Sequence, residues 1–407
     1  MEQDVIIVGG GLNGPALGLA LAQGGLSVTV VDARPALARG EVGFDGRGYA
    51  LAIASKRLLT GIGVWPGVAA LAQPINRIVA SDGHQGQGAA PFFLTFDADE
   101  IEEGPMGFMV EDRHLYAAFV ARMAGQAGLT LIWGETVVAQ QVVGAGIQVT
   151  LASGGMLRGR MVVGSDGRGS GVAARAGIKR AGWDYGQTAM VTAVRHARDH
   201  HGTAQQFFMP SGPLAILPLP GGHLSSIVWT EASANAAAIH ALPDDQYLQA
   251  LQPRFGDFLG EISLAGARFT YPLSLSLATS FTAQRLALVG DAAHGVHNLA
   301  GQGLNLGLRD VGALAEVLIL ARRAGEDIGA ADVLQRYQRW RRFDTTAMAL
   351  GMDAVNRLFS NDHPVLRGVR DLGLGLVNAM PGVRRGFIRQ AAGLTGSLPK
   401  LLAGQPI

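Results

Sequence analysis

The amino-terminal segment constrains the fold of this chain more than any other stretch. Residues 4–8 are strand-like, with Asp4 followed by four apolar β-branched residues, and Gly9-Gly10-Gly11-Leu12-Asn13-Gly14 follows with the spacing G-x-G-x-x-G. A helix is predicted for residues 12–23 and a second strand for residues 27–31, which leads into Asp32. This order predicts a dinucleotide site, because the glycines allow a tight turn and close approach of a pyrophosphate, while the acid can hold ribose hydroxyls.

A second informative stretch is residues 285–311, RLALVGDAAHGVHNLAGQGLNLGLRDV. Residues 286–289 are predicted to form a short buried strand, and Gly290-Asp291 places a carboxylate at its end. A glycine-rich loop then opens a helix that begins at about Leu304. The amino terminus of this helix has free N–H groups and roughly half a positive charge, and it would therefore bind the electron-rich edge of a cofactor. The alternative is an ordinary strand–loop–helix in which the glycines only make turns.

Composition sets broad limits on the class of protein. The chain has 407 residues, of which 48% are hydrophobic, enough for two domains or one large discontinuous domain. Its net charge of +1 argues against nucleic acid as a partner, and the lack of cysteine suits a reducing cytoplasm. Residues 5–31 carry no charge, but their glycines and Pro15 favour two strands around a helix over a membrane span or signal peptide.

The rest of the chain alternates between strand-like and helix-like patterns. Helices are expected for residues 49–59, 333–350 and 352–359, and residues 74–106 are irregular and strand-rich. A buried strand at residues 161–163 leads to Asp166, a second acid at a strand end. Residues 202–230 carry no formal charge apart from a titratable histidine, which predicts sheet core or, alternatively, the wall of an apolar substrate cavity.

Residues 9–14, 165–170 and 290–310 together resemble the FAD-dependent aromatic hydroxylases of the p-hydroxybenzoate hydroxylase superfamily, and more closely its ubiquinone-biosynthesis ring hydroxylases. The most specific parts are AGQGLNLGLRDV and the tail RLFSNDHPVLRGVRDLGLGLVN. The resemblance implies an α/β fold with a Rossmann-like, glutathione-reductase-type FAD-binding domain. It also implies an inserted mixed or antiparallel β-sheet domain for substrate and C-terminal helices. The expected boundaries are 1–73, 106–178 and 272–350 for the FAD domain, 74–105 and 179–271 for the substrate domain, and 351–407 for the tail.

The resemblance also assigns roles within the FAD site. The glycines of the first motif would take the pyrophosphate, Asp32 the ribose, Arg47 and Arg113 the diphosphate and ribityl region, and Asp291 the ribityl chain. Asp166 resembles the acid of a motif linked to FAD and NAD(P)H. The full expected set is Gly9, Gly11, Leu12, Asn13, Gly14, Asp32, Ala33, Arg34, Arg47, Arg113, Val137, Asp166, Gly290, Asp291, Gly301, Gly303, Leu304 and Asn305.

No catalytic side chain is identified by the resemblance, because the flavin does the chemistry; His297 and Asn298 are candidates through their place near it. Two departures from the family pattern concern these roles. The family has the pattern D-G-x-x-S-x-x-R, whereas this chain has Ala173 at the last position and Arg175 two residues later. The second departure is Asn298, where the family has a proline. We expect Ala173→Arg to keep activity and to improve the use of reduced nicotinamide, because it restores the cation of the family pattern. No metal site is expected, since His294 and His297 lack a third ligand nearby.

The implied reaction is ring hydroxylation of a (polyprenyl) phenol in ubiquinone biosynthesis, with NAD(P)H and O2 as co-substrates and a flavin hydroperoxide as oxygen donor. Halogenase or prenyl reductase chemistry is less favoured because no W-x-W-x-I-P segment is present. A non-catalytic flavoprotein subunit of a quinone-biosynthesis assembly is the alternative. The implied substrate is a lipophilic phenol or quinone, no nucleic acid partner is expected, and a homo-oligomer stays open.

The expected location is cytoplasmic, with peripheral contact at the inner face of the cytoplasmic membrane. Residues 366–407 combine six cations with one acid and regularly placed apolar side chains, which is typical of a helix that lies on anionic headgroups. The alternative is that this tail packs on the FAD domain.

Overall fold

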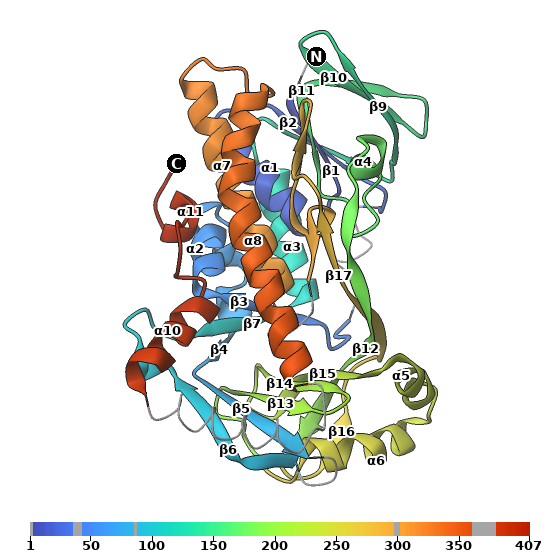
Figure 1. The fold of residues 1–407 in the computed structure, drawn as a ribbon, viewed down its shortest axis with the longest axis vertical. Helices are drawn as coiled ribbons and strands as arrows, with labels where there is room; N and C mark the ends of the chain where they lie inside the picture. The colour runs from blue at the N-terminus through green and yellow to red at the C-terminus, as the bar shows by residue number, and fades with distance from the viewer. Residues whose placement is uncertain (1–2, 36–42, 85–87, 297–301, 360–379) are drawn as a thin grey trace.

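A computed structural model describes residues 3–35, 43–84, 88–296, 302–359 and 380–407. Figure 1 shows two β-sheet regions stacked along the long axis, with helix α8 running from the upper region to the lower one. The upper region contains both the amino-terminal strand and the helices α1 and α7.

The upper sheet has the strand order β18-β19-β11-β1-β2-β8, with β10 and β9 added beside β11. Its strands are β1 (Gln3–Val8), β2 (Val28–Asp32), β8 (Leu129–Trp133), β9 (Val137–Val143), β10 (Gly146–Leu151), β11 (Met156–Gly164), β18 (Thr282–Ala283) and β19 (Leu286–Leu288). Strand β1 is parallel to β2 and β11, and β11 is parallel to β19. The carboxyl ends of these four strands therefore meet at one edge of the sheet, where ligands bind in folds of this kind.

Helices α1 (Asn13–Gln23), α7 (Gln302–Arg323) and α3 (Asp112–Ala124) accompany this sheet. Helix α1 packs against α7, and the apolar strand residues form one large core with both helices. The first and second predicted strands, the helix between them and the strand before Asp291 agree with the structure within one or two residues.

The lower sheet has the order β20-β17-β12-β15-β14-β13-β5-β6, with β16 paired to β12. Its strands are β5 (Arg77–His84), β6 (Gly88–Asp97), β12 (Arg180–His196), β13 (Thr203–Met209), β14 (Gly212–Leu219), β15 (Leu224–Ala232), β16 (Ile262–Leu264), β17 (Phe269–Ala278) and β20 (His294–Gly295). Most pairs are antiparallel, but β13 and β5 are parallel, so the sheet is mixed. Helices α5 (Ser233–His240) and α6 (Asp244–Phe255) accompany it.

The two faces of the lower sheet have different surroundings. Met190, Phe207 and Trp229 pack in a core with Tyr247 and other residues of α6. On the alternate positions of the same strands, Phe208, Leu217 and Val228 are only partly buried. The uncharged run at residues 202–230 therefore supplies sheet core on one face and a half-buried apolar surface on the other.

Two helix predictions were wrong in their boundaries. Residues 49–52 were expected in a helix, but β3 (Gly48–Ala52) pairs with β7 (Gly107–Glu111), and α2 covers only Ile53–Gly61. Pairing with a distant strand overrides the local pattern here. The two predicted helices at 333–350 and 352–359 are one helix, α8 (Ala331–Phe359), because its long packed face offsets the cost of an internal glycine.

The remaining elements are short. They are β4 (Gln73–Ile75), which pairs with β7, α4 (Gly171–Arg175), and the 3-10 turns Trp65–Gly67, Ala69–Leu71, Ala98–Glu100 and Gly290–Ala292. Among the described residues, the structure contains no helix long and apolar enough to span a membrane.

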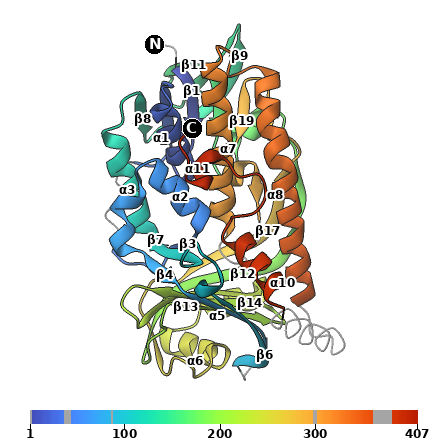
Figure 2. The same ribbon diagram turned by 90° about the vertical axis from the view of Figure 1, so that its left-hand side faces the viewer.

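The described part of the C-terminal tail packs on the body of the protein. Figure 2 shows α11 (Lys400–Ala403) beside α2 and α7, and Leu402 is fully buried in the main core. In α10 (Pro381–Ala391), Arg384 pairs with Glu100 at 2.6 Å and Arg389 with Glu103 at 2.7 Å. These two arginines thus form ion pairs within the chain; residues 366–379 of the predicted membrane tail lie outside the described residues.

Candidate cofactor-binding site

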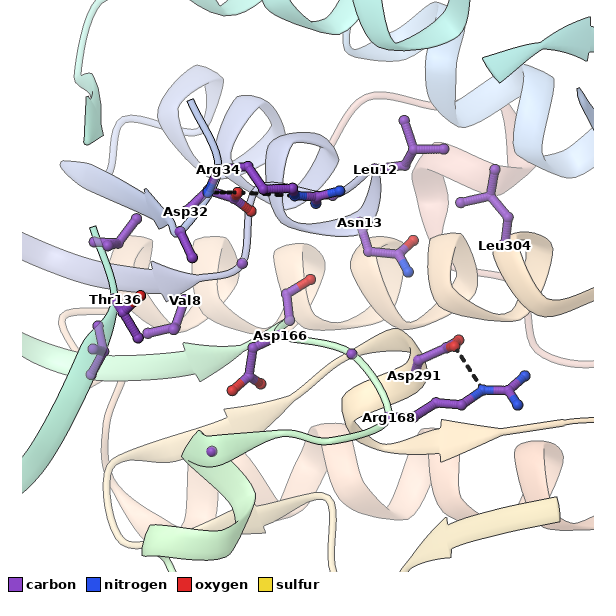
Figure 3. Close-up of a pocket in the computed structure, with 18 of the residues that line it drawn as sticks. Val8, Leu12, Asn13, Asp32, Arg34, Thr136, Asp166, Arg168, Asp291 and Leu304 are labelled. Atoms are coloured by element: carbon purple, nitrogen blue, oxygen red, sulfur yellow. Dashed lines mark hydrogen bonds and ion pairs between the residues drawn. The ribbon is translucent and has the colours of Figure 1, made fainter. Parts of the chain in front are cut away.

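A cleft of about 780 Å³ lies at the carboxyl edge of the upper sheet. Figure 3 shows side chains from β1, α1, the end of β2, the loop after β11 and the turn after β19 converging on it. Twelve of the predicted cofactor residues line this cleft: Gly9, Gly11, Leu12, Asn13, Asp32, Ala33, Arg34, Val137, Asp166, Asp291, Gly303 and Leu304. The fold thus brings together residues from six separate segments of the chain.

The glycines of the first motif have two distinct roles. A Cβ on Gly14 would overlap the carbonyl oxygen of Gly9, and a Cβ on Gly9 would overlap that of Ser165. These two glycines therefore allow α1 and the β11 loop to approach β1 closely. Gly11 has no atom within 4 Å of the position of a Cβ, so it leaves open space on the cleft wall. Gly14 itself does not line the cleft.

Asp32 holds the loops at one end of the cleft. Its Oδ2 accepts a hydrogen bond from Gly10 N at 2.5 Å, and its Oδ1 accepts one from Arg34 N at 2.8 Å. The Arg34 side chain also pairs with Oδ1 at 3.3 Å. The carboxylate thus fixes the glycine loop and is also accessible from the cleft.

Asp291 lies on a turn that is held from several sides. Asp310 Oδ2 accepts a hydrogen bond from Gly290 N at 3.0 Å. From the other side, Arg180 donates to Ala292 O at 2.5 Å and to Asp291 O at 3.1 Å. The Asp291 carboxylate itself faces the cleft and pairs with Arg168 Nε at 3.2 Å, as Figure 3 shows. This turn presents one carboxylate in a fixed place.

Asn13 joins the first motif to this turn and to α7. A Cβ on Gly290 or on Gly307 would overlap the Asn13 side-chain amide, so both glycines provide room for it. The Oδ1 atom of Asn13 is buried and receives no hydrogen bond from the described part of the chain. Gly303, in the first turn of α7, has no atom of the described residues within 4 Å of a Cβ position. An unsatisfied acceptor and two open glycine positions are features of a site that a ligand completes.

Arg47 and Arg113, predicted to approach the diphosphate, do not line the cleft. Arg47 pairs with Asp45 at 2.7 Å and lies over the Phe269 ring, and its hydrogen bond to Asp45 helps raise its pKa. Arg113 pairs with Glu111 at 2.7 Å. Carboxylates of the chain itself therefore neutralise both cations.

Asn305 and Gly290 also lie outside the cleft lining. Asn305 Oδ1 accepts hydrogen bonds from Ala52 N at 2.9 Å and Ser55 Oγ at 2.7 Å, so its side chain fastens α7 to β3 and α2. His297, Asn298 and Gly301 lie outside the described residues.

Several lining residues were not predicted: Tyr49, Glu135, Thr136, Arg168, Gly171, Arg175 and Val296. Arg168 lies within the Asp166 motif and Arg175 lies two residues after its end. This closeness in sequence is the signal that could have pointed to them. Asp166 accepts hydrogen bonds from Ser170 Oγ at 2.5 Å and Val172 N at 3.1 Å and thus holds the start of α4. Ala173 on α4 is 2% exposed and packs in the main core, so an arginine there would have to displace core side chains; the effect of Ala173→Arg on activity stays a prediction.

A family model described as an FAD binding domain matches residues 2–349. The chain belongs to this FAD-binding family. It is 44% identical to the ubiquinone hydroxylase UbiL of Rhodospirillum rubrum, over 99% of this chain and 93% of that protein. It is 36% identical to the 3-demethoxyubiquinol 3-hydroxylase of Escherichia coli, over 96% of this chain and 98% of that protein. The resemblance seen in the sequence motifs is thus confirmed.

The crystal structure of p-nitrophenol 4-monooxygenase PnpA from Pseudomonas putida superposes with a TM-score of 0.80 at 20% identity, covering 97% of this chain and 99% of that one. This likeness confirms the expected α/β fold. The chain is an FAD-dependent monooxygenase by family, and its cleft fits FAD: Gly11 and Gly303 leave room, Asn13 offers an acceptor, and Asp32 and Asp291 offer carboxylates for hydroxyl groups. Within the described ranges, no cluster of three histidine or carboxylate side chains could hold a metal ion.

Proposed function

We propose that this protein hydroxylates the aromatic ring of a polyprenyl phenol or quinone precursor in ubiquinone biosynthesis, with FAD as cofactor and NAD(P)H and O2 as co-substrates. The observation that carries the proposal is the similarity along nearly the whole chain to a protein named as a ubiquinone hydroxylase, at 44% identity. The cleft supports it through the set of residues that fits FAD.

Bound FAD would supply the electron-transfer and oxygen chemistry of this reaction. The residues of the chain would bind and orient it. We assign the ribose to Asp32, the ribityl hydroxyls to Asp291, and the pyrophosphate to the backbone at Gly11. Free N–H groups at the first turn of α7, near Gly303 and Leu304, would face the flavin edge on which negative charge develops. The same partial positive charge would favour reduction of the ring.

The half-buried face of the lower sheet is the proposed wall of the substrate site. Phe208, Leu217 and Val228 belong to this face, and Phe208 lies 4.3 Å from the Phe359 ring at the end of α8. An apolar wall suits a lipophilic ring with a hydrocarbon tail, because removing both surfaces from water is favourable. This face also contains a carboxylate, because Asp82 on β5 is the register partner of Phe208 and is 2% exposed.

The test is a reconstituted assay with purified protein. We expect tightly bound FAD, NAD(P)H oxidation that increases when a prenylated phenol is added, and a product heavier by one oxygen atom. A strain lacking the gene should accumulate the unhydroxylated quinone precursor, identified by mass spectrometry. Two results together would contradict the proposal. The purified protein would oxidise NAD(P)H to give only hydrogen peroxide with every prenylated phenol tried, and the strain lacking the gene would have an unchanged quinone pool.

We further propose that the protein docks on an anionic bilayer to reach this substrate. The solvent face of α8 supports this: it changes from charged residues in its first half to apolar ones, with Phe343 82% and Leu350 49% exposed. Arg339 and Arg342 are exposed on the same helix. Apolar side chains beside cations are typical of a surface that lies at a membrane interface.

Flotation with anionic vesicles tests this docking. The double variant Phe343→Ser/Leu350→Ser should lose binding, whereas Val138→Ser/Met156→Ser, which removes exposed apolar side chains far from α8, should keep it. Equal flotation of both variants would remove α8 from the contact. If purified wild type does not float with the vesicles when no other protein is present, docking onto a quinone-biosynthesis complex is favoured instead.

A further inference from the structure

Three arginines line the cleft, and two of them are paired with acids. Arg34 lies 3.3 Å from Asp32, and Arg168 lies 3.2 Å from Asp291. Arg175 differs from both, because no carboxylate oxygen of the described residues lies within 4.0 Å of its guanidinium. Among the described residues, the cleft therefore contains one cation without a carboxylate partner at ion-pair distance.

The Arg175 side chain is nevertheless held in a defined place. Its Nε donates a hydrogen bond to Gln140 Oε1 at 3.3 Å, and Gln140 Nε2 in turn donates to Val172 O at 3.0 Å. The guanidinium lies back across the start of α4, where a Cβ on Gly171 would be 2.8 Å from its outer nitrogen. Gly171 thus provides the room, Gln140 fixes the inner nitrogen, and the two outer nitrogens remain for an acceptor.

The cleft contains an excess of negative charge that a cation would balance. Four acids line it, Asp32, Glu135, Asp166 and Asp291, and a dinucleotide brings further negative charge with its phosphates. Although Arg175 is accessible from the cleft, partial burial lowers its pKa, and attraction to Asp166 offsets this only in part. A cation that has lost some water without gaining an ion pair binds a phosphate more strongly than a fully solvated one.

We propose that Arg175 is the phosphate-binding arginine of this cleft and takes a phosphate group of a bound dinucleotide. The phosphate belongs either to the diphosphate of FAD or to NAD(P)H, and both present the same oxygen acceptors to a guanidinium fork. The inference rests on the proposed function for the presence of these two ligands. It gives the cationic role to Arg175 in place of Arg47 and Arg113, which form ion pairs outside the cleft.

The test compares Arg175→Ala and Arg175→Gln with Arg158→Ala. Arg158 is a matched control, because its Nε also donates to a glutamine, Gln148, at 3.1 Å, and it does not line the cleft. The deflavinated proteins are titrated with FAD, and the holoproteins are then titrated anaerobically with NADH and NADPH while flavin reduction is followed. Arg175→Gln removes the charge but keeps a polar, though shorter, side chain, which provides a second variant if the alanine variant fails to fold.

Loss of a charge-assisted hydrogen bond should weaken the affected ligand roughly 10- to 100-fold. A raised Kd for FAD in both Arg175 variants assigns Arg175 to the FAD diphosphate. An unchanged Kd for FAD with a raised half-saturating NAD(P)H concentration assigns it to the nicotinamide cofactor. If neither changes relative to Arg158→Ala in folded protein, the inference is wrong. Failure of wild type to hydroxylate any prenylated phenol would contradict only the proposed function, since both titrations can still be made.

Discussion

Asp310 on α7 and Arg341 on α8 form an ion pair in the interior of the protein, with 2.8 Å between Asp310 Oδ1 and Arg341 Nε. The two side chains are 0% and 1% exposed. Asp310 Oδ2 also accepts from Gly290 N at 3.0 Å and contacts His294 Nε2 at 2.5 Å. One carboxylate therefore connects the two long helices to the turn that carries Asp291.

Removal of one partner of this pair should be strongly destabilising. We expect Arg341→Met to lower the free energy of unfolding by about 3–5 kcal/mol, because it removes the buried guanidinium that is paired with a fully buried carboxylate. Arg336→Met on the same helix is the control, since Arg336 forms an exposed pair with Glu326 that contributes about 0–1 kcal/mol. Chemical denaturation measures both. Similar losses in the two variants would contradict the special role of the buried pair.

The stabilisation from this pair should depend on pH. Burial by itself would raise the pKa of Asp310, but attraction to His294 and Arg341 outweighs burial and lowers it below 3.8. A carboxyl whose pKa is lowered by folding stabilises the protein above its unfolded pKa, and this contribution disappears as the pH falls through the folded value. The difference in unfolding free energy between wild type and Arg341→Met should therefore be full at about pH 7 and shrink as the pH falls below about 4 toward the lowered pKa of Asp310. A constant difference would mean that Asp310 does not carry the effect.

Gly11 and Gly14 should respond in opposite ways to the same added methyl group. Gly14→Ala should destabilise the fold by about 1–3 kcal/mol, because its Cβ would overlap the carbonyl oxygen of Gly9. Gly11→Ala should leave stability unchanged but weaken FAD binding, since its Cβ would enter open space on the cleft wall. Thermal unfolding of the deflavinated proteins and FAD titration separate the two effects. Normal FAD affinity in Gly11→Ala would show that the cofactor does not approach this glycine.

The carboxylate of Asp291 should contribute directly to FAD affinity. We expect Asp291→Asn to weaken binding by about 1.5–3 kcal/mol, through loss of a charged acceptor for a ribityl hydroxyl. Asp245→Asn on α6 removes an equal charge far from the cleft and should bind FAD as wild type does. Fluorescence titration of the deflavinated proteins makes the comparison. Equal affinities in all three proteins would remove Asp291 from the site.

Arginine at position 173 should destabilise the protein, although the family pattern has an arginine there. Ala173 is buried in the main core, and a longer charged side chain there would strain the packing and lose hydration, at a cost of about 1–3 kcal/mol or more. Ala174→Arg, one residue further and exposed, should have little effect. Denaturation curves of the two variants decide this; wild-type stability in Ala173→Arg would mean that α4 can shift to accommodate it.

Much of the cofactor site follows from local patterns. Alternation, helical periodicity and glycine spacing arise within a few residues, so the first strand–loop–helix–strand unit, the acid after the strand at residues 286–289 and the helix after the second glycine loop could be predicted. Gly11, Asp32 and Asp291 lie in the cleft because the carboxyl ends of parallel strands share one edge of a sheet. The local patterns, and the place of each acid after a strand, are therefore properties of the sequence alone.

Only the tertiary structure decided which side chains face the cleft. Arg47 and Arg175 are both arginines near a glycine-rich segment, but Arg47 meets Asp45 and Asp112, whereas Arg175 lies across Gly171 and into the cleft. Residues 49–52 form a strand because β7, almost 60 residues away, pairs with them. The physical reason is the same in both cases: charge neutralisation and strand pairing depend on groups that only folding brings within a few ångströms, and no local pattern specifies them.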